Sequence, residues 1–215
     1  KYHDDDEMWN TAEGALRDIM NSLGLEYTEE IGEAAFYGPK LDVNVQPAVG
    51  NEITLSTCQL DFCLPAKFNL YYIDKDGEKK TPVVLHRAIL GSLDRFMAYI
   101  LEETKGNLPT WLAPVQVRVM PVKSDDDTLN AYAQEVVKAL EDRNVRVELD
   151  DRAEKLGYRM REGQVEKVPY LIVLGFKEQE SKTVAYRLHG EADTTVLPLD
   201  EFVEKIDNEI KNKLR

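Results

Sequence analysis

The sequence has few cysteines, few histidines and no long apolar run, and each shortage excludes a class of protein. No apolar segment reaches the roughly 18 residues of a membrane-spanning helix, so we expect no membrane association. The first residues are polar and acidic, unlike a secretory signal peptide. Cys58 and Cys63 are too few for a disulfide scaffold, and their spacing fits no reliable zinc motif. These features predict a cytoplasmic protein with reduced thiols.

Basic residues are also scarce: 27 Lys and Arg stand against 40 Asp and Glu, and the formal net charge is −13. Phosphate contacts favour Lys and Arg, which argues against extensive nucleic-acid binding. A local basic patch can still hold an RNA on an acidic protein, because net charge says nothing about where the charges lie. RNA binding is therefore not excluded.

The length of 215 residues, with 43% hydrophobic residues, suits two domains of ordinary size. A cluster of chain-breaking residues marks the boundary, and it contains Gly106, Pro109, Trp111 and Pro114. We therefore expect domains at 1–108 and 109–215. Lys1 is not a methionine, and a helix is predicted within a few residues of it, so we expect a fragment of a longer protein.

Apolar periodicity predicts a helix and then a mostly antiparallel sheet in the first domain. The expected elements are a helix at 4–23, strands at 41–45, 52–58, 68–73 and 79–85, and a helix at 91–103. Asp76-Gly77, between the last two strands, is a strong hairpin signal. In the second helix, Leu93, Phe96 and Met97 are expected to point into the core.

In the second domain, strands alternate with helices, which predicts an α/β fold with a mixed sheet and helices packed on its faces. The expected strands are 115–122, 145–149, 170–174 and 183–188, and the expected helices are 126–143, 154–165 and 198–214. No internal repeat or low-complexity tract interrupts this pattern.

The segment from His86 to Arg95 is the most informative for chemistry. A buried strand is expected to end at His86, and a helix to begin near Gly91. Ser92 and Arg95 then share one helical face beside free backbone N–H groups, an arrangement that suits a nucleotide polyphosphate. From spacing alone, a surface ion pair is the more common role for such an arginine, and packing the more common role for such a histidine.

Two further segments could contact a polar ligand. Gly38-Pro39 forms a turn that holds Lys40 at a sheet edge, where it could neutralise a phosphate or carboxylate. The strand end at 56–62 carries several small hydrogen-bonding side chains that could contact a polar substrate. A solvated turn lysine and an edge strand with satisfied hydroxyls are the alternatives.

The chain resembles threonyl-tRNA synthetases, which are class II aminoacyl-tRNA synthetases, in the order and spacing of six segments. These are 33–42, 55–62, 82–92, 110–116, 151–158 and 168–170. The resemblance covers essentially the whole chain. It implies that 1–108 is the C-terminal portion of a class II catalytic domain, with a partial antiparallel sheet, and that 109–215 is an anticodon-binding domain.

The resemblance implies an enzyme of protein biosynthesis that activates threonine with ATP and Mg²⁺ and transfers it to the 3′ end of tRNA(Thr). The full-length enzyme would be a homodimer. The resemblance gives catalytic roles to Lys40 and Arg95. The residues matching the ATP and threonine pocket are Tyr37, Lys40, Thr57, Gln59, Ser92 and Arg95.

By the same resemblance, His86 matches one of three ligands of a Zn²⁺ ion that binds threonine through its amino group and hydroxyl. Valine lacks that hydroxyl and would leave the site unsatisfied. The other two ligands, a cysteine and a histidine, precede this chain in the family. We expect zinc in the full-length enzyme and none on this piece, because one ligand cannot fix a tetrahedral site.

Arg161, Glu178 and Arg187 match family positions that contact anticodon bases. Arginine can pair with guanine and a carboxylate can accept from an exocyclic amine, both accessible in a single-stranded loop. The chain departs from the family pattern at three positions that bear on recognition. Thr54 stands where glutamine is common, Ala153 where asparagine is usual, and Phe176 where aspartate is common.

Without the first half of the catalytic domain, this piece is not expected to aminoacylate tRNA alone. The alternative is a non-catalytic RNA-binding or regulatory module derived from a synthetase. A cysteine and a histidine at zinc-site positions upstream would favour the enzyme, and their absence the module. Prolyl-, histidyl- and glycyl-tRNA synthetases are weaker matches, because the segment around His86 carries the zinc ligand typical of threonyl-tRNA synthetases.

Overall fold

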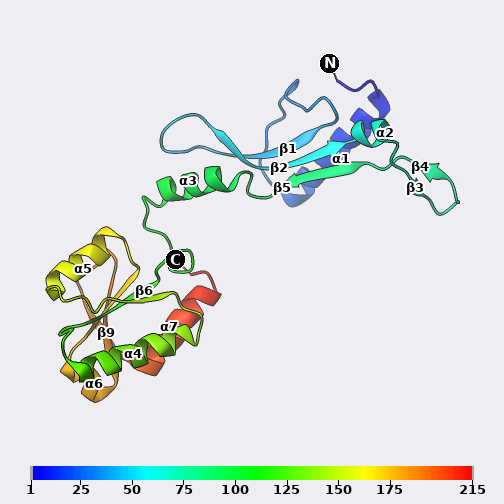
Figure 1. The fold of residues 1–215 in the computed structure, drawn as a ribbon. Coiled ribbons are helices and arrows are strands. Elements are labelled where there is room, and N and C mark those ends of the chain that lie inside the picture. The colour runs from blue at the N-terminus through cyan, green and yellow to red at the C-terminus, as the bar shows by residue number, and fades with distance from the viewer. Residues whose placement is uncertain (1, 215) are drawn as a thin grey trace. The chain divides into compact units, whose positions relative to one another are not determined.

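The computed structural model describes residues 2–214 and divides into two compact units, 1–103 and 104–215 (Figure 1). Each unit has its own sheet and helices, and each is described separately below. Among the described helices, none combines the length and the apolar character needed to cross a lipid bilayer.

The N-terminal unit begins with α1 (Asp6–Leu23), which confirms the helix predicted at 4–23. Asp5 caps its first turn by accepting a hydrogen bond from a backbone N–H, and Gly24 ends it at a φ of 64°. Trp9 packs edge-on against Phe62, with ring centroids 5.4 Å apart. This aromatic contact attaches the helix to the segment that follows the second strand of the sheet.

The sheet of this unit has three antiparallel strands in the order β1-β2-β5. Their bounds are β1 (Lys40–Val45), β2 (Ile53–Asp61) and β5 (Val84–Ala88). β2 is therefore the central strand, and its segment 56–62 is not the edge strand that the sequence allowed as an alternative. Side chains directly opposite one another on neighbouring strands lie on the same face.

The predicted hairpin exists, but its strands are much shorter than expected. β3 (Tyr72–Ile73) pairs with β4 (Lys79–Lys80), and the loop between them includes Gly77 at a φ of 81°. The predicted strand at 79–85 is wrong, because Pro82 interrupts it and cannot donate to a ladder. The short helix α2 (Leu64–Lys67) was not predicted.

The region around the second predicted helix also differs from expectation. α3 (Leu93–Glu103) begins after Gly91, which adopts a φ of 62°. Its apolar residues are not in a core: Leu93 is 68% exposed and Met97 43% exposed. β5 is likewise exposed and ends at Ala88, not at His86. None of the residues of α3 is buried in the described part of this unit, so amphipathicity alone did not bury its apolar face.

The C-terminal unit contains a five-stranded mixed sheet in the order β10-β9-β8-β6-β7. The strands are β6 (Val117–Pro121), β7 (Val147–Leu149), β8 (Tyr170–Leu174), β9 (Thr183–Leu188) and β10 (Thr195–Pro198). β6 runs parallel to β7 and β8, whereas β9 is antiparallel to both of its neighbours. The mixed sheet is confirmed, but β10 and the short helix α6 (Phe176–Ser181) were not predicted.

Helices cover both faces of this sheet (Figure 1). α4 (Asp127–Glu141) and α7 (Leu199–Lys211) bury one face, and Phe202 is fully buried there beside strand residues such as Ile172. On the other face, α5 (Leu156–Val165) packs on Met120 and Leu171. This single helix rests on β6 and β8.

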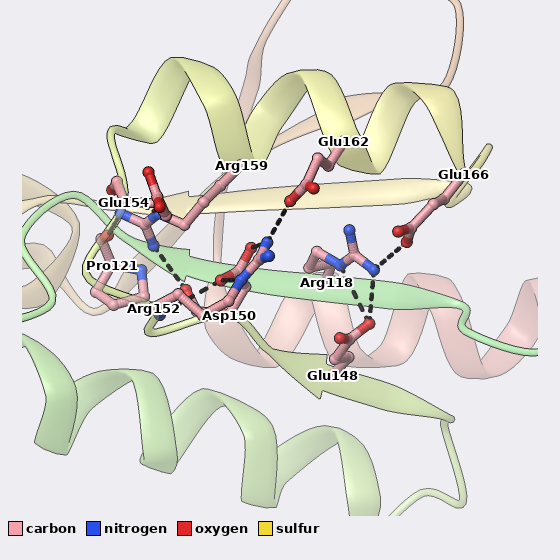
Figure 2. Close-up of polar contacts among 9 residues, drawn as sticks. All are labelled: Arg118, Pro121, Glu148, Asp150, Arg152, Glu154, Arg159, Glu162 and Glu166. Carbon is pink, nitrogen blue, oxygen red and sulfur yellow. Dashed lines mark hydrogen bonds and ion pairs between the residues drawn. The ribbon is translucent and has the colours of Figure 1, made fainter.

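A buried arginine of α5 binds the end of β6 and the loop that follows β7 (Figure 2). Arg159 is 1% exposed and donates to the carbonyl oxygens of Asp150 at 2.6 Å and Pro121 at 2.8 Å. A third bond reaches the Glu154 carbonyl at 3.2 Å. Because its five donors form a rigid fork, one guanidinium satisfies three carbonyl groups from two segments and joins the end of β6 to the loop that leads into α5.

Candidate functional site

One face of the N-terminal sheet gathers the polar side chains that the sequence singled out. Lys40, Gln59 and His86 lie directly opposite one another across β1, β2 and β5. Thr57 lies two residues before Gln59 on β2, and strand side chains alternate between faces, so it shares that face. The strand register therefore brings four predicted site residues together on one surface.

Tyr37 joins this surface through a close approach of its loop to β2. A Cβ atom on Gly38 would lie 2.1 Å from the Leu60 carbonyl oxygen, so only glycine fits there. Tyr37 donates its hydroxyl hydrogen to Gln59 Oε1 at 2.7 Å. Its ring meets the His86 ring edge-on, with centroids 5.8 Å apart. Tyr37, Gln59 and His86 are therefore in mutual contact.

Asp61 is a member of this surface that the sequence analysis missed. It is fully buried at the end of β2, and its Oδ2 lies 2.8 Å from His86 Nε2. Burial by itself raises the pKa of Asp61, but hydrogen bonds from His86 and from backbone N–H groups outweigh it and leave the pKa below its usual value. The available signal was the alternation of β2, which places Asp61 on the face of Gln59.

Two further side chains of this face could interact with a ligand: the hydroxyl of Thr57 and the ammonium group of Lys40. Thr57 Oγ1 is buried and has no hydrogen-bond partner among residues 2–214. Lys40 forms an ion pair with Asp42, its neighbour on the same face of β1. A buried hydroxyl without a partner is uncommon in proteins, and a bound polar ligand would satisfy it.

The structure places Ser92 and Arg95 at the start of α3. Ser92 Oγ accepts the backbone N–H of Arg95 at 3.3 Å, so this hydroxyl serves as a helix cap. In the described chain, the exposed Arg95 guanidinium has no ion-pair partner, and no hydrogen bond or ring contact joins it to Tyr37 or His86. The structure thus joins Tyr37, Gln59 and His86 at the sheet, and the places of Ser92 and Arg95 in a shared site stay a prediction.

The C-terminal unit has a cavity of about 520 Å³ beside α5, β8 and β9. Its lining includes apolar side chains such as Leu171 together with Glu178 and Arg187. Arg187 Nη2 donates to Thr194 Oγ1 at 3.2 Å, while its buried Nε has no partner in the described residues. Glu178 Oε2 accepts the Gly175 N–H at 2.9 Å. Two of the three predicted anticodon residues therefore meet at one cavity.

The third, Arg161, is an exposed residue of α5 and does not line that cavity. At the departures from the family pattern, Thr54 donates its hydroxyl to Asn44 Oδ1 at 2.8 Å across β1 and β2. Phe176 is 49% exposed at the start of α6. Thr54 thus makes a local contact within the sheet in place of the one expected of glutamine.

Residues 2–214 contain no cluster of three or more His, Cys, Asp or Glu side chains placed to hold a metal ion. Cys63 is buried, and Cys58 lies opposite Arg87 on the other face of β2 from His86. Any metal bound at His86 must therefore take further ligands from outside the described chain.

Two family models match the chain: the class II core domain of tRNA synthetases (G, H, P, S and T) over residues 2–104 and the anticodon binding domain over residues 116–209. A threonine–tRNA ligase of Staphylococcus saprophyticus is 53% identical over 213 residues, which are 99% of this chain and 33% of that protein. The chain belongs to the threonyl-tRNA synthetase family. It spans about a third of the length of the curated relatives it matches.

Further members of the threonyl-tRNA synthetase family are also similar to this chain. The threonine–tRNA ligase of Halalkalibacterium halodurans is 52% identical, covering 98% of this chain and 32% of that protein. A crystal structure described as the RNA binding domain of threonyl-tRNA synthetase from Cryptosporidium parvum aligns with a TM-score of 0.85 and 35% identity. That alignment covers 97% of this chain and 52% of the other. The first unit is thus the end of a class II catalytic domain, and the second has the anticodon-binding fold.

Proposed function

We propose that this chain is part of an enzyme that attaches threonine to tRNA(Thr) through a threonyl-adenylate made from ATP. The observation that carries this proposal is the polar face of the first sheet, where Tyr37, Gln59 and His86 are in mutual contact. This face lies in a chain about half identical to threonine–tRNA ligases along nearly its whole length. Small-molecule sites commonly carry a few placed polar groups of this kind, which fix the orientation of the ligand.

In the proposed first step, a threonine carboxylate oxygen attacks the α-phosphorus of ATP, and the bond to pyrophosphate breaks. The step needs alignment and charge neutralisation more than proton transfer. Tyr37, Thr57 and Gln59 orient the substrates, and Thr57 Oγ1 offers a buried hydroxyl with no partner in the described chain. Lys40 and Arg95 supply positive charge for the phosphates together with Mg²⁺, and Ser92 fixes the start of the helix that presents Arg95.

A Zn²⁺ ion in the full-length enzyme would hold the amino group and hydroxyl of threonine and so reject valine. His86 fits the role of one ligand. Its side chain is 45% exposed, its Nε2 is engaged by the buried Asp61, and its Nδ1 has no partner among residues 2–214. In this proposal, the other two ligands come from the part of the full-length protein that precedes this chain.

We further propose that residues 109–215 bind the anticodon, and that 1–108 belong to the catalytic domain. Gln116 donates to the Thr110 carbonyl at 2.9 Å, and Thr110 in turn bonds to Glu209 of α7, so the segment after 109 is attached to the C-terminal unit. The cavity offers Arg187 donors to a guanine edge and Glu178 oxygens to an exocyclic amine. Arg161 contacts the RNA from the exposed side of α5. The homodimer and the cytoplasmic location rest on the family alone.

The decisive experiment compares the full-length protein with the 215-residue chain. We expect the full-length protein to catalyse threonine-dependent exchange of pyrophosphate into ATP and to charge tRNA(Thr), with valine inactive. The chain alone should do neither, because it spans only a third of its relatives. Inactive full-length protein with tRNA binding by the chain would favour the non-catalytic RNA-binding module instead. Charging by the 215-residue chain alone would refute its assignment as an incomplete part of the enzyme.

A further inference from the structure

Asp61 is a buried carboxylate of the N-terminal unit, and each of its two oxygens has a hydrogen-bond partner. Among the described residues of that unit, it is the one acidic side chain that is buried. Its Oδ1 accepts backbone N–H groups from Cys63 at 3.0 Å and Leu64 at 2.9 Å. Its Oδ2 lies 2.8 Å from His86 Nε2. The two backbone donors therefore fix the orientation of the carboxylate independently of His86.

This arrangement determines which nitrogen of a neutral His86 carries the proton. An ionised carboxylate can only accept, so His86 Nε2 must be the N–H nitrogen. The lone pair then lies on Nδ1, which has no partner among residues 2–214. Tyr37 packs against the ring and is itself held by Gln59, so the ring plane is supported from a second side.

We infer that Asp61 is a positioning residue that holds His86 in the Nε2–H tautomer and thereby leaves Nδ1 as the metal-ligating atom. The inference deepens the proposed function and depends on it for the identity of the metal, which is zinc. Ligating histidines commonly donate their second N–H to a carboxylate, which sets ring orientation and raises ligand basicity. The buried Asp61 supplies that contact from within this chain.

Asp61→Asn tests this inference sharply because it reverses one hydrogen bond while keeping the shape. The backbone N–H groups of Cys63 and Leu64 still require an acceptor, so the amide oxygen must occupy the Oδ1 position. The amide NH₂ group then faces His86 Nε2 and can only donate to it. Nε2 becomes the acceptor, and the proton moves to Nδ1, where it blocks the metal-binding lone pair.

The first measurement uses the 215-residue chain without metal. Nitrogen-15 spectra of the His86 ring, recorded in alkaline buffer, report directly which ring nitrogen carries the proton. We expect Nε2–H in the natural sequence and Nδ1–H in Asp61→Asn. Asp74→Asn is a matched control, because Asp74 Oδ1 also accepts two backbone N–H groups, at 2.9 Å each, in a hairpin loop that does not contact His86. An unchanged tautomer in folded Asp61→Asn would overturn the inference.

The second measurement is zinc affinity of the full-length protein. Changes to residues that support a metal ligand commonly cost about 10–100-fold in metal affinity, so we expect that loss for Asp61→Asn and none for Asp74→Asn. Equal zinc affinity despite a reversed tautomer would refute the positioning role. A natural full-length protein that binds no zinc would refute the metal in the proposed function, whereas the tautomer result would stand by itself.

A second substitution guards against an Asp61→Asn protein that does not fold. The serine hydroxyl of Asp61→Ser can accept from the same backbone N–H groups but does not reach His86. We expect a mixture of both tautomers and a zinc affinity between those of the natural and Asp61→Asn proteins. Retention of a pure Nε2–H tautomer in Asp61→Ser would show that Asp61 does not set it.

Discussion

At the scale of single residues, the two candidate sites depend on polar atoms whose partners are incomplete. Thr57 Oγ1 on the first sheet and Arg187 Nε at the cavity are both buried without a partner in the described chain. Buried polar groups are normally hydrogen-bonded, so a partner supplied by a ligand has a physical reason to bind at each place. Asp61 shows the opposite case, since all its bonds are made and its effect passes through His86.

Arg187→Lys should weaken recognition of the anticodon without removing charge. Lysine cannot form the paired hydrogen bonds that a guanidinium makes with guanine, so we expect about a 10-fold or greater loss of affinity for the tRNA(Thr) anticodon stem-loop. The salt dependence should change little, because the charge is kept. Binding is measured by fluorescence anisotropy on the 215-residue chain. Arg143→Lys, at the end of α4, is the control. Equal losses for cognate and exchanged anticodons would contradict base readout.

His189 should make the stability of the C-terminal unit depend on pH. Burial, and then the charge of Lys167, lower the pKa of His189 in the folded protein, and its Nδ1 is buried without a partner in the described chain. An unfolded imidazole has a pKa of about 6.5. Stability from this group is therefore present above about pH 6.5 and is lost as the pH falls, because the unfolded chain binds the proton more readily.

Urea unfolding between about pH 5 and 8, followed by Trp111 fluorescence in a Trp9→Phe background, measures this effect. We expect the free energy of unfolding to fall towards the acidic end and the fall to be smaller in His189→Asn, which cannot take up the proton. Parallel pH profiles for the two proteins would show that His189 is not the responsible group.

At the scale of elements, α5 is held in place by one buried guanidinium as well as by apolar packing. Arg159 supplies hydrogen bonds to three carbonyl oxygens, one at the end of β6 and two in the loop between β7 and α5 (Figure 2). Arg152 adds bonds to Asp150 and to Glu162 of α5. Since α5 also forms one wall of the cavity, these bonds position the candidate anticodon site.

Arg159→Leu should strongly destabilise the C-terminal unit. It leaves buried carbonyl groups without donors, each of which costs roughly 1–3 kcal/mol, so we expect a total loss of about 3 kcal/mol or more. Arg143→Leu is the control, because its ion pair with Asp207 is exposed and such pairs contribute about 1 kcal/mol or less. Chemical denaturation measures both. If Arg159→Leu lowered the free energy of unfolding no more than the control does, Arg159 would not hold α5 in place.

Element prediction from sequence succeeded where local patterning and tertiary packing agree. α1 and β8 were predicted closely, because caps, periodicity and a short apolar run each have a local cause. The hairpin was predicted too long, because Pro82 ends a ladder whose extent depends on a partner strand. β10 was missed because Thr195–Pro198 has little strand signal of its own and forms by pairing with β9.

At the scale of the whole molecule, the two units differ in how much apolar surface they bury. The C-terminal unit has a continuous core between its sheet and α4 and α7. In the N-terminal unit, α3 has no buried residue, and β5 exposes Leu85 to 63%. The N-terminal unit therefore leaves more of its large apolar side chains exposed among the described residues than the C-terminal unit does. The chain spans about a third of the length of its relatives.

We therefore expect the two units of the isolated chain to unfold separately, with the N-terminal unit first. Hydrogen exchange followed by mass spectrometry should show slow exchange in β6 and β8 and fast exchange in α3 and β5. Adding the rest of the full-length protein should slow exchange in α3 and β5 and leave β6 and β8 unchanged. Equal protection of both units in the isolated chain would contradict the difference in burial.

The sequence by itself determined the family, the helix and strand types, and the residue types available for chemistry, because these depend on local patterns and ordered motifs. The tertiary structure decided which of those residues meet. Strand register placed Lys40, Gln59 and His86 in one row, and a glycine-permitted approach added Tyr37. It also showed the contact between Asp61 and His86, whereas Arg95 makes no direct contact with Tyr37 or His86 in the described chain. Pairing between distant segments sets these contacts, and no local pattern encodes them.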